Sequence, residues 1–258
     1  MENFTTIASN PLDQFEIRNI IGVNISILNN LYLSLTNIGL YLIISLILSL
    51  MFTLLTENKE KLLMNKWSLN QESITITVKN LVLNQISGTN GQLYFPFIYT
   101  LFMFILINNL LGMVPYNFAS TSHFVLTFSL SFTIVLGATL LGFQKHGLKF
   151  FSLFVPAGCP LGLLPLLVLI EFISYLSRCV SLGLRLGANV MSGHMLLNIL
   201  SGFIYKIMAS GIIYFIIGLV PLAFVVALCG LELAIAFIQA YVFVILTSSY
   251  IKDGLYLH

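Results

Sequence analysis

Long uncharged stretches of mostly apolar residues divide the sequence into a few blocks. No charged residue occurs within residues 20–56 or within residues 80–144. A helix needs about 20 mostly apolar residues to cross the hydrocarbon core of a membrane. The pattern therefore predicts an all-α polytopic membrane protein, because outer-membrane strands would alternate apolar and polar residues instead. We expect about five membrane-crossing helices, over residues 31–55, 94–115, 122–143, 162–201 and 210–252.

Residues 67–87 are too polar to cross a membrane, and they predict one further helix that lies at its surface. Ile74, Val78 and Leu81 recur at helical spacing, which favours an amphipathic helix. Ile74, Ile76 and Val78 also alternate, as the residues of a half-buried strand do. The strand therefore stays open as the alternative structure for this segment.

The last third of the chain predicts two unusually long helices. Residues 162–201 form one helical pattern, and no proline occurs within residues 166–220. At about 1.5 Å per residue, this helix is roughly 60 Å long, about twice the thickness of the hydrocarbon core. We expect it to tilt steeply and to turn near residues 205–206. Residues 210–252 then form its antiparallel partner.

The composition agrees with a membrane protein. Charged residues make up 8% of the chain and hydrophobic residues 58%, and the mean hydropathy is +0.99. Soluble domains contain roughly 25% charged residues, so an ordinary soluble domain and a disordered protein are excluded. A net charge of +2 provides no basic surface for nucleic acid. We interpret residues 1–258 as one membrane domain, made of an N-terminal segment (1–30), a first span (31–55), an interfacial helix (67–87), a helical pair (94–143) and a tilted hairpin (162–252).

The positive charges predict the orientation of the chain. Five crossings place seven lysines on one side of the membrane and only Arg18 and Lys206 on the other. Lysine and arginine are enriched on the inner side of membranes, so we expect the N-terminus outside and the C-terminus inside. The seven lysines are Lys59, Lys61, Lys66, Lys79, Lys145, Lys149 and Lys252.

Apart from His123 and Lys252 at span ends, the acidic, basic and histidine residues inside the predicted spans occur only on the two long helices. Such residues are costly in a membrane and are a functional hypothesis by default. Gln239 is a further polar residue on the second of these helices, and Asp253 lies near its end. The ionisable residues are Glu171, Arg178, Arg185 and His194 on the first helix and Glu232 on the second.

Polar side chains follow two faces of the first long helix. His194 is nine residues beyond Arg185, which places it about 180° round the helix, and Asn198 follows one turn later. The other face carries residues that are spaced by one or two helical turns. These are Glu171, Arg178, Ser181, Arg185, Asn189 and Ser192.

Two offset polar regions separated by one permanent cation predict paired half-channels for protons. Histidines and carboxylates exchange protons, whereas arginine cannot be deprotonated in a protein. Arg185 would therefore block leakage and attract a passing carboxylate, which we expect on another subunit. Arg178 is equally well interpreted as a structural bridge to Glu171, and Ser181 and Ser192 as packing residues, as Asn198 can be.

Several motifs resemble one known family, ATP synthase subunit a, the stator channel subunit of the membrane motor. Residues 181–194 (SLGLRLGANVMSGH) resemble its signature. Residues 109–116 (NLLGMVPY) and 231–243 resemble its third and last helices. Residues 11–18 (PLDQFEIR) and 249–258 (SYIKDGLYLH) are similar to the ends of fungal mitochondrial members.

The resemblance implies roles for several polar residues of the hairpin. The two long helices would face a rotating ring of c subunits, each with a membrane carboxylate. Protons would reach that carboxylate past His194 and Glu232 and would leave near Glu171 and Asp253. The family also places Gln239 level with Arg185, where both would separate the two half-channels, together with Asn189.

The resemblance further implies a non-catalytic subunit that has no catalytic site, cofactor or metal. Its partners would be the c-ring, the peripheral stalk, other small membrane subunits and the lipid bilayer, with no nucleic acid; a dimeric complex stays open. The location would be the mitochondrial inner membrane, with the N-terminus in the intermembrane space and the C-terminus in the matrix. A short leader, about residues 1–9, would be removed.

A proton-coupled secondary transporter is the alternative function. Transporters of this class have inverted repeats and helices broken near the membrane midplane. Neither feature is evident in the sequence. A cytochrome b would need paired haem histidines, which four scattered histidines do not supply.

Overall fold

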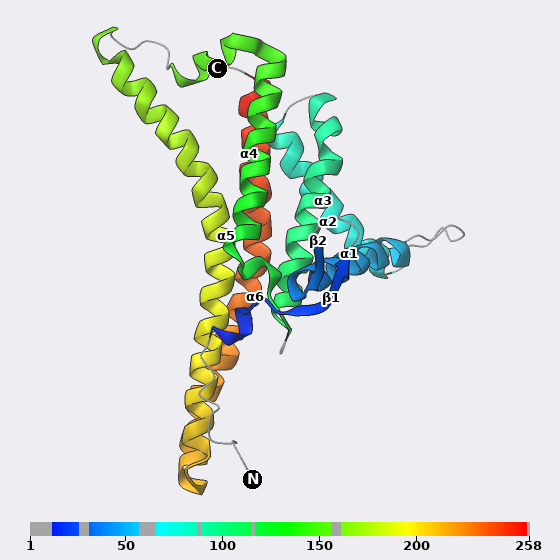
Figure 1. Ribbon diagram of the computed structural model, residues 1–258, viewed down its shortest axis with the longest axis vertical. Helices are drawn as coiled ribbons and strands as arrows, with labels where there is room; N and C mark the ends of the chain where they lie inside the picture. Colours follow the sequence, from blue (N-terminus) through cyan, green and yellow to red (C-terminus); the bar gives the residue numbers. More distant parts are fainter. Residues whose placement is uncertain are drawn as a thin grey trace.

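The computed structural model describes residues 12–25, 31–56, 66–86, 89–114, 117–155 and 161–256. Within these residues the chain forms six α-helices, several short 3₁₀ helices and one pair of strands. Figure 1 shows α3, α4 and α6 side by side and the long helix α5 next to α4 and α6, while α1 lies across their direction. The α-helices are α1 (Asn37–Thr56), α2 (Lys66–Gln85), α3 (Thr89–Gly112), α4 (Phe124–His146), α5 (Leu164–Met208) and α6 (Ile212–Leu255).

Among the residues that the structure describes, five helical stretches are long and apolar enough to cross a membrane, which confirms the prediction of an all-α polytopic membrane protein. They are Asn37–Thr56, Gly91–Gly112, Phe124–Phe154, Leu164–Met208 and Ile212–Leu255. The expected leader within residues 1–9, and Lys59 and Lys61 of the basic loop, lie outside the described residues.

The first span begins six residues later than the hydrophobic pattern predicted. Strands β1 (Asn19–Ile25) and β2 (Leu31–Thr36) pair in antiparallel fashion and occupy the segment before the helix. The side chain of Asn37 stabilises the helix start, because its Oδ1 accepts a hydrogen bond from the Ile38 amide and its Nδ2 donates one to the Glu16 carbonyl. The change from strand to helix could not be seen in the hydrophobic pattern, because the strand and the helix are both uncharged and mostly apolar.

The segment that was ambiguous between helix and strand is helical. α2 buries Val78, Leu81 and Val82, and it contacts α3. Much of the rest of the helix is exposed, including Trp67 and Lys79. The strand alternative is therefore wrong, and the apolar positions follow helical spacing because they pack on a neighbouring helix.

The long hairpin consists of two unbroken helices. α5 has 45 residues and α6 has 44, with Pro221 inside α6. The turn lies later than expected, because α5 continues to Met208 and the chain reverses at Gly211, whose φ of +156° favours glycine. Figure 1 shows that the start of α5 stands away from α4 and α6, while the rest of α5 runs beside α6. The steep tilt in the membrane stays a prediction.

Aromatic rings hold the separated start of α5 to the rest of the protein. The 3₁₀ helix η3 (Gly147–Phe154) follows α4, and its Phe154 ring lies edge-on to the rings of Phe172 and Tyr175 at 5.9 and 5.8 Å. The Tyr175 ring also meets Tyr250 of α6, at 6.5 Å between centroids. These contacts bridge α5 to η3 and α6 where the helix backbones diverge.

Close packing between α4 and α5 depends on two glycines. A Cβ atom at Gly183 would lie 2.8 Å from Ser131 Oγ and 3.2 Å from the carbonyl oxygen of Thr127. A Cβ atom at Gly187 would lie 3.0 Å from Thr127 Oγ1 and 3.1 Å from a ring carbon of Phe124. Small residues allow membrane helices to approach closely, and here they fix the position of the middle of α5.

We expect Gly183→Val to destabilise the protein by about 1–3 kcal/mol, because the added atoms overpack the contact with α4. The apparent melting temperature in mild detergent should fall by several degrees. Gly137→Val on α4 is the matched control, since a Cβ there meets nothing within 4 Å. Equal melting temperatures for the two variants would contradict the packing argument.

Candidate functional site

The predicted functional residues fall into three groups along the α5–α6 hairpin. The first group surrounds His194 and Glu232, the second contains Arg185, and the third contains Arg178 with Glu171 and Asp253. At about 1.5 Å per residue, His194 lies about 13 Å along α5 from Arg185, and Arg178 lies about 10 Å away in the other direction. The two outer groups are therefore on opposite sides of Arg185.

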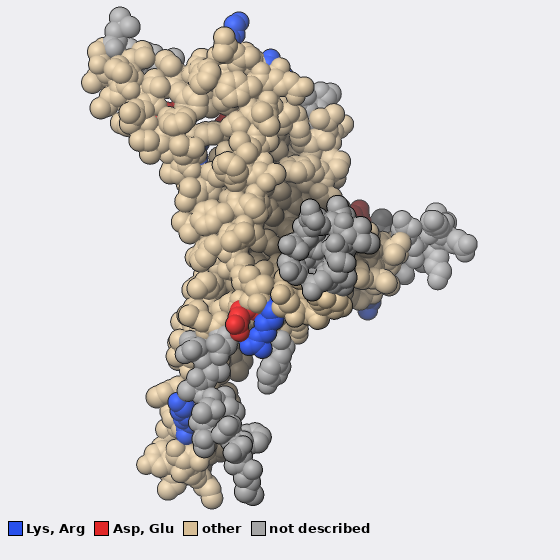
Figure 2. Space-filling view, in the orientation of Figure 1, with Lys and Arg blue, Asp and Glu red and all other residues tan. Residues whose placement is uncertain are grey.

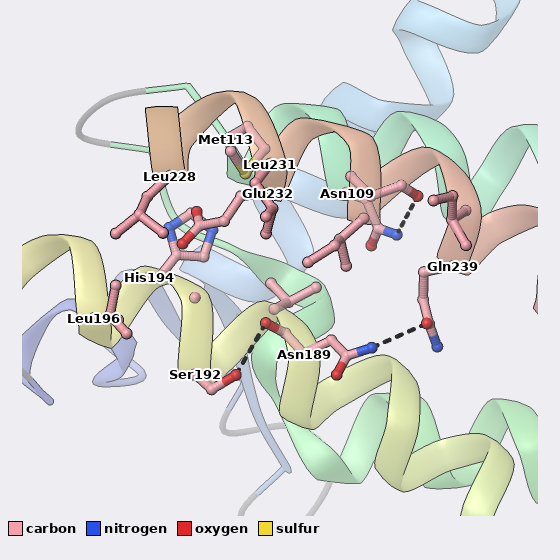
Figure 3. A pocket seen from close by; sticks show the side chains of 15 residues that line it. Asn109, Met113, Asn189, Ser192, His194, Leu196, Leu228, Leu231, Glu232 and Gln239 are labelled. Carbon is pink, nitrogen blue, oxygen red and sulfur yellow. Dashed lines mark hydrogen bonds between the residues drawn. The ribbon is translucent and has the colours of Figure 1, made fainter. Parts of the chain in front are cut away.

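A pocket of about 390 Å³ lies between α3, α5 and α6 and is called the His194 pocket below. Figure 3 shows His194 and Glu232 at one end of this pocket and Asn189 and Gln239 at the other. Apolar side chains form the remaining walls. Its polar lining residues are Asn109, Asn189, Ser192, His194, Glu232 and Gln239.

His194 and Glu232 share this pocket, and the family resemblance had associated the same two residues. Both side chains are half-buried. His194 Nε2 is buried, and it makes no hydrogen bond within the part of the chain that the structure describes. A buried polar atom without a partner is unfavourable unless water or a proton carrier reaches it. The pocket therefore has room and chemistry for such a carrier beside both groups.

Gln239 lies one helical turn away from the expected level. The resemblance placed it level with Arg185, but Asn189 Nδ2 donates a hydrogen bond of 3.0 Å to Gln239 Oε1. Gln239 is 4% exposed, and its own Nε2 has no partner among the described residues. The hydrogen bond thus joins Gln239 to the residue one helical turn beyond Arg185 on α5.

Asn109 of α3 belongs to the same pocket, on a helix for which the sequence predicts no site residue. Its Nδ2 donates a hydrogen bond of 3.4 Å to the carbonyl of Ala236 on α6. Its Oδ1 is buried and lacks a partner within the described ranges, and the side chain lines the pocket. The sequence feature that could have indicated this role is an asparagine in a predicted span that has no charged residue.

The connection between α3 and α4 approaches the His194 end of the hairpin. The 3₁₀ helix η2 (Ser120–Ser122) contacts α5, and a Cβ atom at Gly112 would lie 3.6 Å from His194 Nε2. His123 follows η2 and lies just before the start of α4, and burial lowers the pKa of its imidazole. His123 is thus favoured in its neutral form and adds no positive charge here.

Arg185 occupies an open face of α5. Its side chain is exposed, and it makes no hydrogen bond or ion pair with any other residue that the structure describes. It lines a shallow hollow of about 570 Å³. The other residues of this hollow are Ser177, Val180, Ser181, Leu184 and Ala188. A permanent cation is therefore presented on a surface that is otherwise uncharged.

Arg178 lies between two acids. Its guanidinium is 3.4 Å from Glu171 Oε1 and 4.0 Å from Asp253 Oδ2. The predicted bridge to Glu171 is present, and Asp253 of α6 joins it. Figure 2 shows openings in the surface near the start of α5, with acidic atoms visible inside them. The three side chains thus form a charged cluster where α5 separates from its neighbours; we call it the Arg178 cluster.

The remaining polar residues of α5 serve local roles. Ser192 Oγ donates a hydrogen bond to the Asn189 carbonyl, and Ser201 Oγ donates one to the carbonyl of Asn198. Asn198 does not line the His194 pocket, whereas Ser181 lies in the hollow beside Arg185. Among the described residues, no group of three histidines, cysteines or acids could hold a metal ion.

Comparison with known proteins identifies the family. The family model of the ATP synthase A chain matches residues 39–252. ATP synthase subunit a of Emericella nidulans is 70% identical over 258 residues, and that of Cochliobolus heterostrophus is 69% identical, each covering the whole of both chains. The subunit a of Saccharomyces cerevisiae is 50% identical over 253 residues, which is 98% of each chain. With full-length identity of this degree and a matching family model, the chain belongs to the ATP synthase A chain family.

Proposed function

We propose that this chain conducts protons through two offset half-channels beside a rotating c-ring and so couples a proton gradient to ATP synthesis. Family membership supports a role as a membrane subunit of ATP synthase. The observation that carries the finer proposal is Arg185, exposed and without a partner in the described chain, between two separate groups of proton-exchanging residues.

Arg185 acts as the barrier between the half-channels. Placing an arginine at the centre of a membrane helix costs about 2.5–3.5 kcal/mol even on the more permissive scales. A ring carboxylate that loses its proton would recover part of this cost by approaching the guanidinium. Because arginine keeps its proton, no proton can pass through it from one half-channel to the other.

The His194 pocket is the uptake half-channel. His194 and Glu232 are the groups in it that can carry a proton. Asn109, Asn189 and Gln239 extend its polar lining toward the level of Arg185. A proton from the intermembrane space would reach a ring carboxylate along this side and neutralise it for its passage through lipid.

The Arg178 cluster is the release half-channel. Glu171 and Asp253 are both half-buried, so part of each side chain stays open to the surroundings. A proton displaced from the ring as its carboxylate approaches Arg185 would pass to these acids and then to the matrix. Arg178 holds the two acids together, because two carboxylates without a cation would repel each other.

The surroundings of the chain follow from the same proposal. The chain lies in the mitochondrial inner membrane, with the N-terminus in the intermembrane space and the C-terminus in the matrix. Its neighbours are the c-ring, the peripheral stalk and other small membrane subunits. A secondary transporter would have helices broken near the midplane, whereas α5 and α6 are each continuous.

Arg185→Ala should reduce proton-driven ATP synthesis to background while the complex still assembles, because the barrier and the attraction for the ring carboxylate are both lost. Synthesis is measured in inner-membrane vesicles that are energised by a pH gradient. Lys206→Ala, which removes another exposed cation of α5, is the control and should leave the rate unchanged. A normal rate in Arg185→Ala would exclude the mechanism.

His194→Ala and Glu232→Gln should each slow proton uptake, and the double variant should be no slower than the worse single variant. Residues that act in one pathway have non-additive effects. The rate of ATP synthesis is measured as the pH of the intermembrane-space side is varied. Independent losses that simply multiply would show that the two residues do not share a pathway.

Arg178→Gln should slow ATP synthesis several-fold, because Glu171 and Asp253 lose the cation between them. Arg178→Lys keeps the positive charge and should retain most of the rate. The same vesicle assay measures both variants. An unchanged rate in Arg178→Gln would mean that this arginine is only a structural bridge.

A further inference from the structure

The carboxyl group of Glu232 packs directly against the backbone of α5 at Gly193. A Cβ atom at Gly193 would lie 2.8 Å from Glu232 Oε1, 2.9 Å from Cδ and 3.3 Å from Cγ. Contacts under about 3.0 Å cannot persist, so any side chain at this position would occupy space that the carboxyl group now fills. Both residues line the His194 pocket, and Gly193 immediately precedes His194.

This relation sets Gly193 apart from the other glycines that the structure describes. A Cβ atom at Gly183 or Gly187 would meet residues of α4, and one at Gly218 would meet Met208. At Gly202 on α5 and at Gly230 on α6, a Cβ atom would meet nothing within 4 Å. Within the described ranges, Gly193 is the glycine whose Cβ would come within 3.0 Å of an ionisable group.

We propose that Gly193 is a positioning residue that sets where the Glu232 carboxyl group stands in the uptake half-channel. The inference rests on the proposed function of the His194 pocket. Because Gly193 has no side chain, the carboxyl group lies against α5, beside the residue that carries His194. Gly193 itself exchanges no proton, and it acts only through the place that it leaves open for Glu232.

The atoms that an alanine side chain at Gly193 would meet indicate that this substitution changes the function and keeps the fold. At Gly193 they belong to the far end of a flexible glutamate side chain, which can rotate away. At Gly183, by contrast, the carbonyl oxygen of Thr127 is among the neighbours, and backbone atoms cannot move aside so easily. Alanine also favours a helix over glycine. Gly193→Ala should therefore assemble normally and displace the carboxyl group.

The test is Gly193→Ala in the complete complex, measured in energised inner-membrane vesicles. We expect assembly at the normal level, a fall of about tenfold or more in proton-driven ATP synthesis, corresponding to about 1.4 kcal/mol on the barrier, and a shifted dependence on the pH of the intermembrane-space side. Gly202→Ala and Gly230→Ala are matched controls and should behave as the parent complex. A Gly193→Ala rate and pH profile equal to those of the controls would overturn the proposal.

A second variant shows whether the effect acts through Glu232. Aspartate is one methylene shorter than glutamate, so its carboxyl carbon would stand near the present Cγ position, 3.3 Å from an added Cβ atom, and the two closest conflicts would be relieved. We expect Gly193→Ala with Glu232→Asp to be faster than Gly193→Ala alone, although Glu232→Asp alone is slower than the parent. Additive losses would overturn the proposal. Should Gly193→Ala fail to assemble, assembly restored by Glu232→Asp supports the conflict, and continued failure refutes it.

Glu232→Gln in the parent background separates this inference from the proposed function. A normal rate of synthesis in Glu232→Gln would mean that Glu232 carries no proton, and the function proposed for the pocket would fail. A loss in Glu232→Gln, together with a normal rate and pH profile in Gly193→Ala, would leave that function intact and refute the positioning role alone.

Discussion

The cost of keeping a permanent positive charge on an apolar helix governs the arrangement of the α5–α6 hairpin. Within the described chain, Arg185 has no ionic partner, while Arg178, two turns away, has two. The difference follows from placement, because Arg178 meets Asp253 of α6 and Arg185 faces an open hollow. In the proposed mechanism, a ring carboxylate compensates this cation, and the His194 pocket and the Arg178 cluster lie on either side of it.

Most of the fold could be predicted from the sequence, because long uncharged apolar runs indicate membrane helices directly. The five spans and the long hairpin followed from uncharged runs and from the absence of proline in residues 166–220. The strand pair before Asn37 could not be predicted in this way, since β2 is an uncharged, mostly apolar segment that runs directly into the helix. Hydrophobicity alone does not distinguish a strand from a helix over six residues.

The residues of the site were easier to predict than their mutual register. Charges are rare in the spans, so His194, Glu232 and Arg185 stood out. The partner of Gln239 depends on how two helices pack; the family resemblance placed Gln239 level with Arg185, whereas its hydrogen-bond partner is Asn189. Gly193 carried no chemical signal at all. Its importance lies in the space beside it, which only the packed structure reveals.

The two glycines that press α5 onto α4 have a mechanical consequence. Gly183 and Gly187 lie two residues before and after Arg185, and both bring α5 into close contact with Thr127 of α4. In the proposed mechanism, a ring carboxylate that pulls on Arg185 would exert a sideways force on α5. The contacts with α4 would transmit that force with little deformation, since well-packed interiors are barely compressible. The helix pair would thus act as a rigid support, so that the torque turns the ring and does not bend this chain.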